Sequence, residues 1–176
     1  MNSSTFSLRA LALAAAALAA GCASTLTAPD VPAAIRAPAG QELFLEALAS
    51  GVQIYECAPK AGSAEHEWAF RAPEATLADR SGRALGKHYA GPSWEGLDGS
   101  VVVGEVKGRD PGPDKSAIPW LLLNAKSTSG NGLYSKTRSI QRVTTTAGLA
   151  PTTACNAGNA KQVARVPYTA IYYFYR

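Results

Sequence analysis

The sequence predicts an all-β protein, either a single antiparallel β-sandwich or a small barrel of about eight strands. Apolar and polar residues alternate over many short stretches, which is the pattern of strands with one buried face. Gly, Pro and Asp separate these stretches at short intervals, as the turns of an antiparallel sheet do. No stretch sustains the apolar period of an amphipathic helix, about 3.6 residues.

The first three strand-like stretches lie between residues 43 and 71. Leucine and alanine side chains alternate with polar ones in 43–47, and Gly51 breaks that run. The alternation resumes in 52–57 and again in 66–71, where two aromatic residues fall on one face. These three stretches are each typical of a half-buried strand.

Two turns predict hairpins in the middle of the chain. The first turn, 79–82, joins expected strands at 75–78 and 83–89. The second contains Asp98-Gly99, a strong hairpin signal, and precedes a valine-rich strand at 101–106.

The last third of the chain continues this pattern of strands and loops. Proline and glycine make 108–114 a loop, and Ser and Gly do the same in 127–132. The apolar run within 118–125 indicates a strand covered on both faces, or a short buried helix. Residues 137–146 are β-branched and alternating, and 166–176 are aromatic, so both are expected to be strands.

The N-terminus has the features of a segment that directs export. Residues 1–10 are polar with one positive charge, and 11–20 are an unbroken run of Leu and Ala. That run is half as long as the roughly 20 apolar residues of a membrane-spanning helix. We therefore expect 1–21 to be a signal peptide that is removed from the mature protein.

The apolar run leads directly into Leu18-Ala19-Ala20-Gly21-Cys22. This segment resembles a bacterial lipobox, although Ala19 stands where leucine is usual. The resemblance implies cleavage before Cys22 and a lipid-anchored protein of the cell envelope. Ala23 is not the aspartate that favours inner-membrane retention, so we expect the outer membrane or its periplasmic face. The alternative is an ordinary secretory signal cut near Ala20 or Ala23.

Residues 22–40 are expected to join the lipidated cysteine to the folded domain. They contain Pro29, Pro32 and Pro38 among small residues, which predicts an extended, semi-rigid tether and not a packed element. The remaining 41–176 suits one all-β domain.

The charge distribution argues against one class of partner. The formal net charge of +4 is spread thinly, and no cluster of Lys and Arg forms a face that could follow phosphates. We expect no nucleic-acid partner.

The cysteines predict a disulfide. If Cys22 carries lipid, then Cys57 and Cys155 remain, and an exported chain with two further cysteines most often pairs them. The alternative is a pair of buried free thiols.

Several short motifs occur together along the domain. They are Gly51-Val52-Gln53-Ile54-Tyr55-Glu56-Cys57, Gly91-Pro92-Ser93-Trp94-Glu95, Asp98-Gly99-Ser100, Ile118-Pro119-Trp120-Leu121-Leu122-Leu123, Ile140-Gln141-Arg142 and Pro167-Tyr168-Thr169-Ala170. The set resembles the domain of unknown function numbered 3455, which occurs in exported bacterial and fungal proteins, over nearly the whole mature domain. The resemblance implies no activity, because none is established for the family.

Some members of the family carry a dehydrogenase label, but this sequence lacks the motif of a dinucleotide-binding site. Gly130-Asn131-Gly132 is the nearest approach to a dinucleotide fingerprint, but the third glycine is missing and a β-branched segment follows in place of a helix. We therefore expect no nicotinamide and no other cofactor.

The densest polar cluster surrounds one of the two histidines. His88 with Glu95 or Asp98 could act as a general acid and base, which gives a hydrolase as one hypothesis. The alternative is structural: Trp94 belongs to the core and Asp98 caps its own hairpin. The residues assign no catalytic group, and they lack the spacing of a known metal site.

We favour a non-catalytic module that binds a small molecule, a glycan or a protein partner. The aromatic side chains of Trp94 and Trp120 each lie beside a proline, and such rings form binding surfaces when one edge stays open. A purely structural envelope protein is the remaining hypothesis. The candidate binding residues are His88, Trp94, Glu95, Asp98, Trp120 and Arg142.

Overall fold

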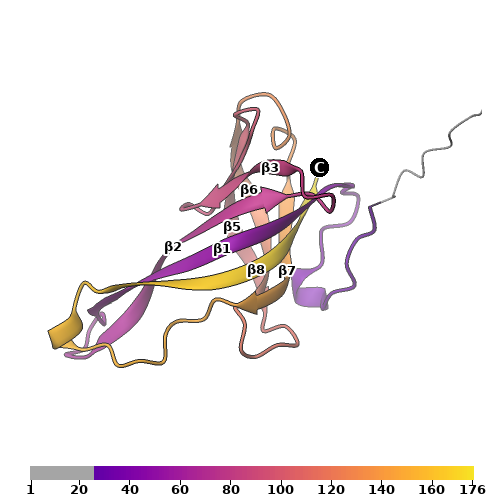
Figure 1. Cartoon of the computed structure of the whole chain (residues 1–176). Coiled ribbons are helices and arrows are strands. Elements are labelled where there is room, and N and C mark those ends of the chain that lie inside the picture. The colour runs from indigo at the N-terminus through magenta and orange to yellow at the C-terminus, as the bar shows by residue number, and fades with distance from the viewer. Residues whose placement is uncertain (1–25) are drawn as a thin grey trace, which may run out of the picture.

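The structure is a computed structural model, and it describes residues 26–176. The expected signal peptide and the lipid-bearing Cys22 lie outside these residues. Eight strands make up most of the described chain (Figure 1). They are β1 (Leu43–Pro59), β2 (His66–Ala78), β3 (Ala84–Tyr89), β4 (Ser93–Gly96), β5 (Val101–Asp110), β6 (Trp120–Ser129), β7 (Ser139–Ala147) and β8 (Val163–Tyr175).

The strands form one antiparallel sheet that closes into a barrel in the order β1 to β8. Strand β1 closes it, since β1 pairs with β2 on one edge and with β8 on the other. The predicted all-β class and the number of strands are confirmed, and of the two architectures left open the barrel is the one formed. Within residues 26–176, no helix is long and apolar enough to cross a membrane.

Two of the expected strand breaks are wrong. Strand β1 runs without interruption through Gly51, and β2 joins the stretches expected separately at 66–71 and 75–78. The reason lies at Gly51, where a Cβ atom would stand 2.1 Å from the carbonyl oxygen of Glu74. Glycine there lets β2 approach β1 closely and does not end the strand.

The barrel interior is filled at one end by aromatic and aliphatic side chains. Trp94 is 1 % exposed and packs edge-on against Tyr172 and Phe174, with ring centroids 5.3 and 6.0 Å away. Tyr134 adds a further ring 4.9 Å from Phe174. The core thus comes from the inward-facing positions of strands that are distant in sequence.

The segment that precedes β1 differs from the expected extended tether. The short 3₁₀ helix η1 (Ala33–Ile35) lies against the outside of the barrel, with Ile35 fully buried and Val31 7 % exposed. Both side chains join a second apolar cluster with Leu122 and Val143, whose side chains point outward from β6 and β7. These outward apolar side chains require a cover, which explains why the segment packs despite its prolines. We call residues 31–37 the strap.

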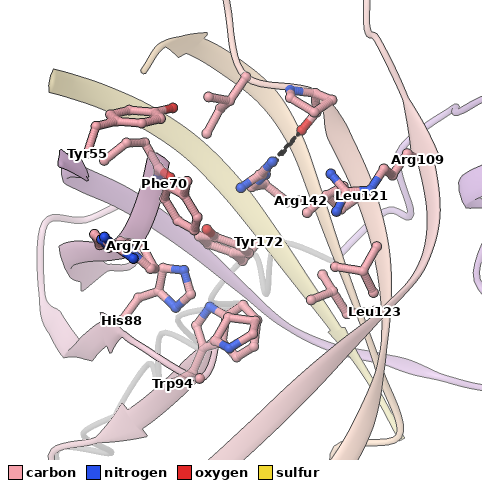
Figure 2. Close-up of a pocket in the computed structure, with 17 residues that line it drawn as sticks. Tyr55, Phe70, Arg71, His88, Trp94, Arg109, Leu121, Leu123, Arg142 and Tyr172 are labelled. Atoms are coloured by element: carbon pink, nitrogen blue, oxygen red, sulfur yellow. Dashed lines mark hydrogen bonds between the residues drawn. The ribbon is translucent and has the colours of Figure 1, made fainter. Parts of the chain in front are cut away.

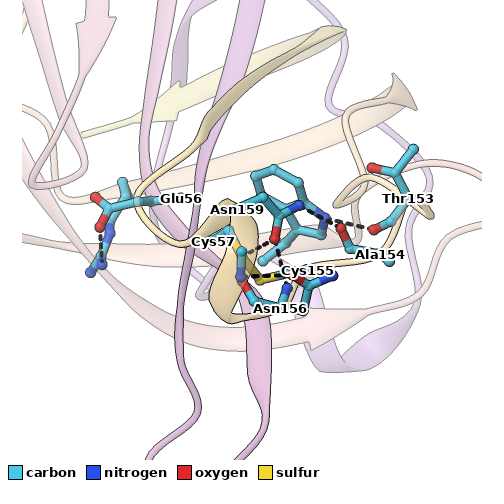
Figure 3. The surroundings of a disulfide bond; sticks show 10 residues. Glu56, Cys57, Thr153, Ala154, Cys155, Asn156 and Asn159 are labelled. Carbon is cyan, nitrogen blue, oxygen red and sulfur yellow. Dashed lines mark hydrogen bonds and ion pairs between the residues drawn. A yellow bond between two sulfur atoms is a disulfide. The ribbon is translucent and has the colours of Figure 1, made fainter.

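The predicted disulfide between Cys57 and Cys155 is present, with Cα atoms 5.5 Å apart. It ties the end of β1 to the loop before β8 (Figure 3). The same loop is held by the indole nitrogen of Trp68, which donates to the carbonyl oxygen of Thr153 at 2.9 Å. In Figure 1 this region is the far end of the long strands β1, β2 and β8, beyond the rest of the barrel.

Candidate functional site

A cavity of about 510 Å³ occupies the end of the barrel that the core leaves open (Figure 2). All eight strands contribute side chains to it, which places it inside the ring of strands. Its size is within the range of small-molecule sites, about 300–1,000 Å³. Its lining includes Gln53, Tyr55, Phe70, Arg71, His88, Trp94, Val106, Arg109, Leu121, Leu123, Arg142 and Tyr172.

The floor of the cavity consists of three stacked or tilted rings. The imidazole of His88 stacks on the indole of Trp94 with centroids 4.4 Å apart and planes 16° from parallel. The ring of Tyr172 lies 5.1 Å from His88. The cross-strand pairing of His88 with Trp94 in β3 and β4 explains the stack, because paired residues present their side chains on the same face.

The protonation state of His88 follows from its surroundings. Its Nδ1 lies 2.8 Å from the carbonyl oxygen of Ser93, and a carbonyl can only accept, so Nδ1 carries the proton. Burial lowers the pKa of His88 from 6.5 to about 3, and the positive charge of Arg142 lowers it further while the bond to Ser93 acts in the other direction. The ring is therefore neutral near pH 7, with Nε2 as its acceptor.

Arg142 is the half-buried cation of the cavity wall. Its Nε and Nη2 donate to the carbonyl oxygen of Pro119 at 3.2 and 2.7 Å. Among residues 26–176 it forms no ion pair. Its charge affects the two tyrosines near it. Burial raises the pKa values of Tyr55 and Tyr172, and the positive charge of Arg142 partly opposes this rise.

The rim of the cavity is more exposed and carries two further arginines. Arg71 pairs with Glu56 at 3.3 Å, while Arg109 is exposed on β5. The ring of Phe70 is 52 % exposed and meets the ring of Tyr55 edge-on, with centroids 5.6 Å apart. The opening therefore combines apolar surface with positive charge.

Of the six candidate binding residues, His88, Trp94 and Arg142 meet in this cavity. Glu95 follows Trp94 on β4 and so points to the outer face, where its carboxylate binds Lys87 at 3.1 Å and the Tyr89 hydroxyl at 2.8 Å. Its pKa is lowered by these contacts, that with Tyr89 most.

Asp98 and Trp120 also lie away from the cavity. The carboxylate of Asp98 accepts hydrogen bonds from the backbone N–H and hydroxyl of Ser100 and from the N–H of Leu133, so it holds the hairpin turn together. Trp120 is partly buried against the apolar cluster that the strap covers. The pairing of His88 with Glu95 or Asp98 that a hydrolase would use is therefore not formed.

Tyr55, Phe70, Arg71, Arg109 and the leucines of β6 also line the cavity and were not among the residues expected to form a site. One signal was present for the first two, since aromatic residues stand at alternating positions of their strands. The sequence contains no such signal for Arg71 and Arg109, because their position at the rim depends on how the barrel closes. Among the described residues, no group of three or more His, Cys, Asp and Glu side chains is arranged to hold a metal ion.

The fold and the site together define a small closed antiparallel barrel with a cavity at one end. The family model described as protein of unknown function (DUF3455) matches residues 38–176, and the chain belongs to this family. No curated protein and no solved structure matches the chain.

Proposed function

We propose that this protein is a non-catalytic, lipid-anchored envelope protein that binds a small molecule in the open end of its barrel. The observation that carries the binding proposal is the cavity of about 510 Å³, to which every strand contributes. Apolar side chains make up most of its wall, with a few polar groups among them, which is the usual composition of a small-molecule site. Such a cavity binds ligand without any reacting group.

The glycan alternative has less support, because stacking on a sugar needs an exposed ring face. Trp94 is 1 % exposed and one of its faces is covered by His88. Trp120 packs against the cluster under the strap. Trp94 therefore has no open face, and Trp120 lies outside the cavity.

Binding can be tested with N-phenyl-1-naphthylamine, a neutral apolar dye that fluoresces when it leaves water. We expect saturable binding to the wild-type protein. Val106 lines the cavity and is 38 % exposed, so Val106→Trp narrows the entrance and weakens binding by about tenfold or more.

Val163→Trp is the matched control, because Val163 is 55 % exposed on β8 and does not line the cavity. We expect it to bind the dye as the wild type does. Absence of dye binding to the wild type, or equal loss in both variants, would contradict the proposal.

The anchoring proposal depends on residues 11–22 and on Cys22 in particular. A lipoprotein cysteine carries several acyl chains, and each buried methylene contributes about 0.8 kcal/mol to membrane attachment. We expect the wild-type protein in the membrane fraction with the mass of acyl chains on Cys22, and Cys22→Ser in the soluble fraction. A soluble wild-type protein with an unmodified N-terminus would show an ordinary secretory signal.

A further inference from the structure

The charge of the cavity has one sign. Its lining includes Arg71, Arg109 and Arg142 and, among the described residues, no aspartate or glutamate. A cavity with low-dielectric walls and charges of one sign attracts ligands of the opposite sign. The carboxylate of Glu56, which does not line the cavity, pairs with Arg71 on the partly exposed side.

Arg142 occupies an unusual place for a cation. It follows Ile140 and Gln141 on β7, which are 0 and 1 % exposed, and its side chain turns into the barrel. Both of its hydrogen bonds go to one oxygen, that of Pro119, and these bonds fix the plane of the guanidinium. An arginine has five N–H donors, so three remain for another partner.

A partly buried guanidinium without a carboxylate is costly unless something else satisfies it. Figure 2 shows the guanidinium of Arg142 among the side chains that line the cavity, joined to the carbonyl oxygen of Pro119. An anion that entered the cavity would meet the remaining donors there, in the paired geometry that arginine offers to carboxylates.

The floor also contains three buried polar atoms. The indole nitrogen of Trp94 and the hydroxyl oxygen of Tyr172 are buried and form no hydrogen bond with any of residues 26–176. The same is true of the amide nitrogen of Gln53. All three side chains line the cavity, but these three atoms are buried beneath its surface, so the arginines are the hydrogen-bond donors that an entering ligand meets.

We propose that the ligand is an organic carboxylate with a flat apolar body. Its carboxylate binds Arg142, and its body lies between the rings of Tyr55 and Phe70 and the leucines of β6. This inference rests on the proposed binding function and specifies the chemical class of the ligand.

The test compares 2-naphthoate with 2-naphthamide, which have the same ring system and differ in charge. Both are titrated calorimetrically into the exported protein with its disulfide formed. We expect naphthoate to bind more tightly by about tenfold or more, because charge-assisted hydrogen bonds are stronger than neutral ones. Added salt weakens the binding of naphthoate and leaves that of naphthamide unchanged.

Two variants locate the effect. Arg142→Gln is expected to remove the preference for naphthoate over naphthamide. Arg142→Lys keeps the positive charge without the planar donors, so it is expected to retain part of that preference. Arg36→Gln removes one positive charge from an exposed position on the strap and is expected to leave the preference intact. Circular dichroism of the variants shows that the barrel is folded.

The outcomes separate the two proposals. If the dye and naphthamide bind as tightly as naphthoate, or if Arg36→Gln reduces the preference as much as Arg142→Gln does, the carboxylate proposal is wrong and the binding function stands. If the dye binds and neither 2-naphthoate nor 2-naphthamide does, the carboxylate proposal is again wrong. If no compound binds, the binding function fails as well.

Discussion

At the scale of single residues, His88 makes the stability of the protein depend on pH. Burial lowers its pKa from 6.5 to about 3, so the folded protein keeps the ring neutral in a range where the unfolded chain binds a proton. The unfolded state then gains protons as the pH falls below 6.5, and the free energy of unfolding falls until about pH 3. One group contributes at most about 1.4 kcal/mol per pH unit.

His88→Asn tests this dependence. The asparagine amide can still donate to the carbonyl oxygen of Ser93 but has no proton to gain. Urea unfolding of the variant is expected to show a smaller loss of stability between pH 6.5 and 3 than the wild type. His66→Asn, at the partly exposed start of β2, is the control, and the hypothesis fails if both variants change the slope equally.

The candidate site could be predicted in part from single residues. His88 stood out because it lies in the densest polar cluster, Trp94 because it lies beside a proline, and Arg142 because it belongs to one of the family-like motifs. Alternation along the strand places Glu95 on the other face from Trp94, and the turn at Asp98-Gly99 uses the carboxylate of Asp98. These two carboxylates were grouped with the site because they are near in sequence, but neighbouring residues of a strand point apart.

At the scale of elements, the strap is the part that sequence reasoning described least well. Proline content predicted an extended segment, and it gave no indication that Val31 and Ile35 would be buried. The contact is close, since a Cβ on Gly108 of β5 would stand 2.1 Å from the carbonyl oxygen of Ala34. Propensity describes the local backbone, whereas the cover that outward apolar side chains require is a tertiary effect.

We expect Ile35→Ala to reduce the free energy of unfolding by about 2–5 kcal/mol, because Ile35 is fully buried and its loss leaves a cavity under the strap. The amide of Gln141, which donates to the carbonyl oxygen of Ile35 at 2.7 Å, keeps its partner in this variant. Urea unfolding measures the change. Arg36→Ala, next in the chain and exposed, is expected to remain within about 0.5 kcal/mol of the wild type, and equal effects would mean that the strap does not stabilise the barrel.

At the scale of the whole molecule, closure of the sheet could not be decided from the sequence. The strands were placed near their observed positions, but a sandwich and a barrel have the same alternation of apolar residues. Closure depends on the pairing of β1 with β8, residues separated by most of the chain. The cavity depends on that closure, and so the lining by Arg71 and Arg109 could not be foreseen.

The disulfide acts on the molecule as a whole, because Cys57 and Cys155 are 98 residues apart in sequence. Joining them shortens a long loop of the unfolded chain, which in the chain-entropy model stabilises the folded state by about 4–5 kcal/mol. The double variant Cys57→Ala, Cys155→Ala is therefore expected to unfold at lower urea concentration.

A reducing agent gives an independent control on this prediction. It should lower the stability of the wild type to that of the double variant and leave the variant unchanged. Since disulfides form in oxidising compartments, a chain without residues 1–21 that stays in the cytosol should show the same low stability as the double variant. Equal stability of the exported and cytosolic chains would mean that the bridge adds nothing to the closed barrel, whose pairing of β1 with β8 would then suffice to hold the two ends together.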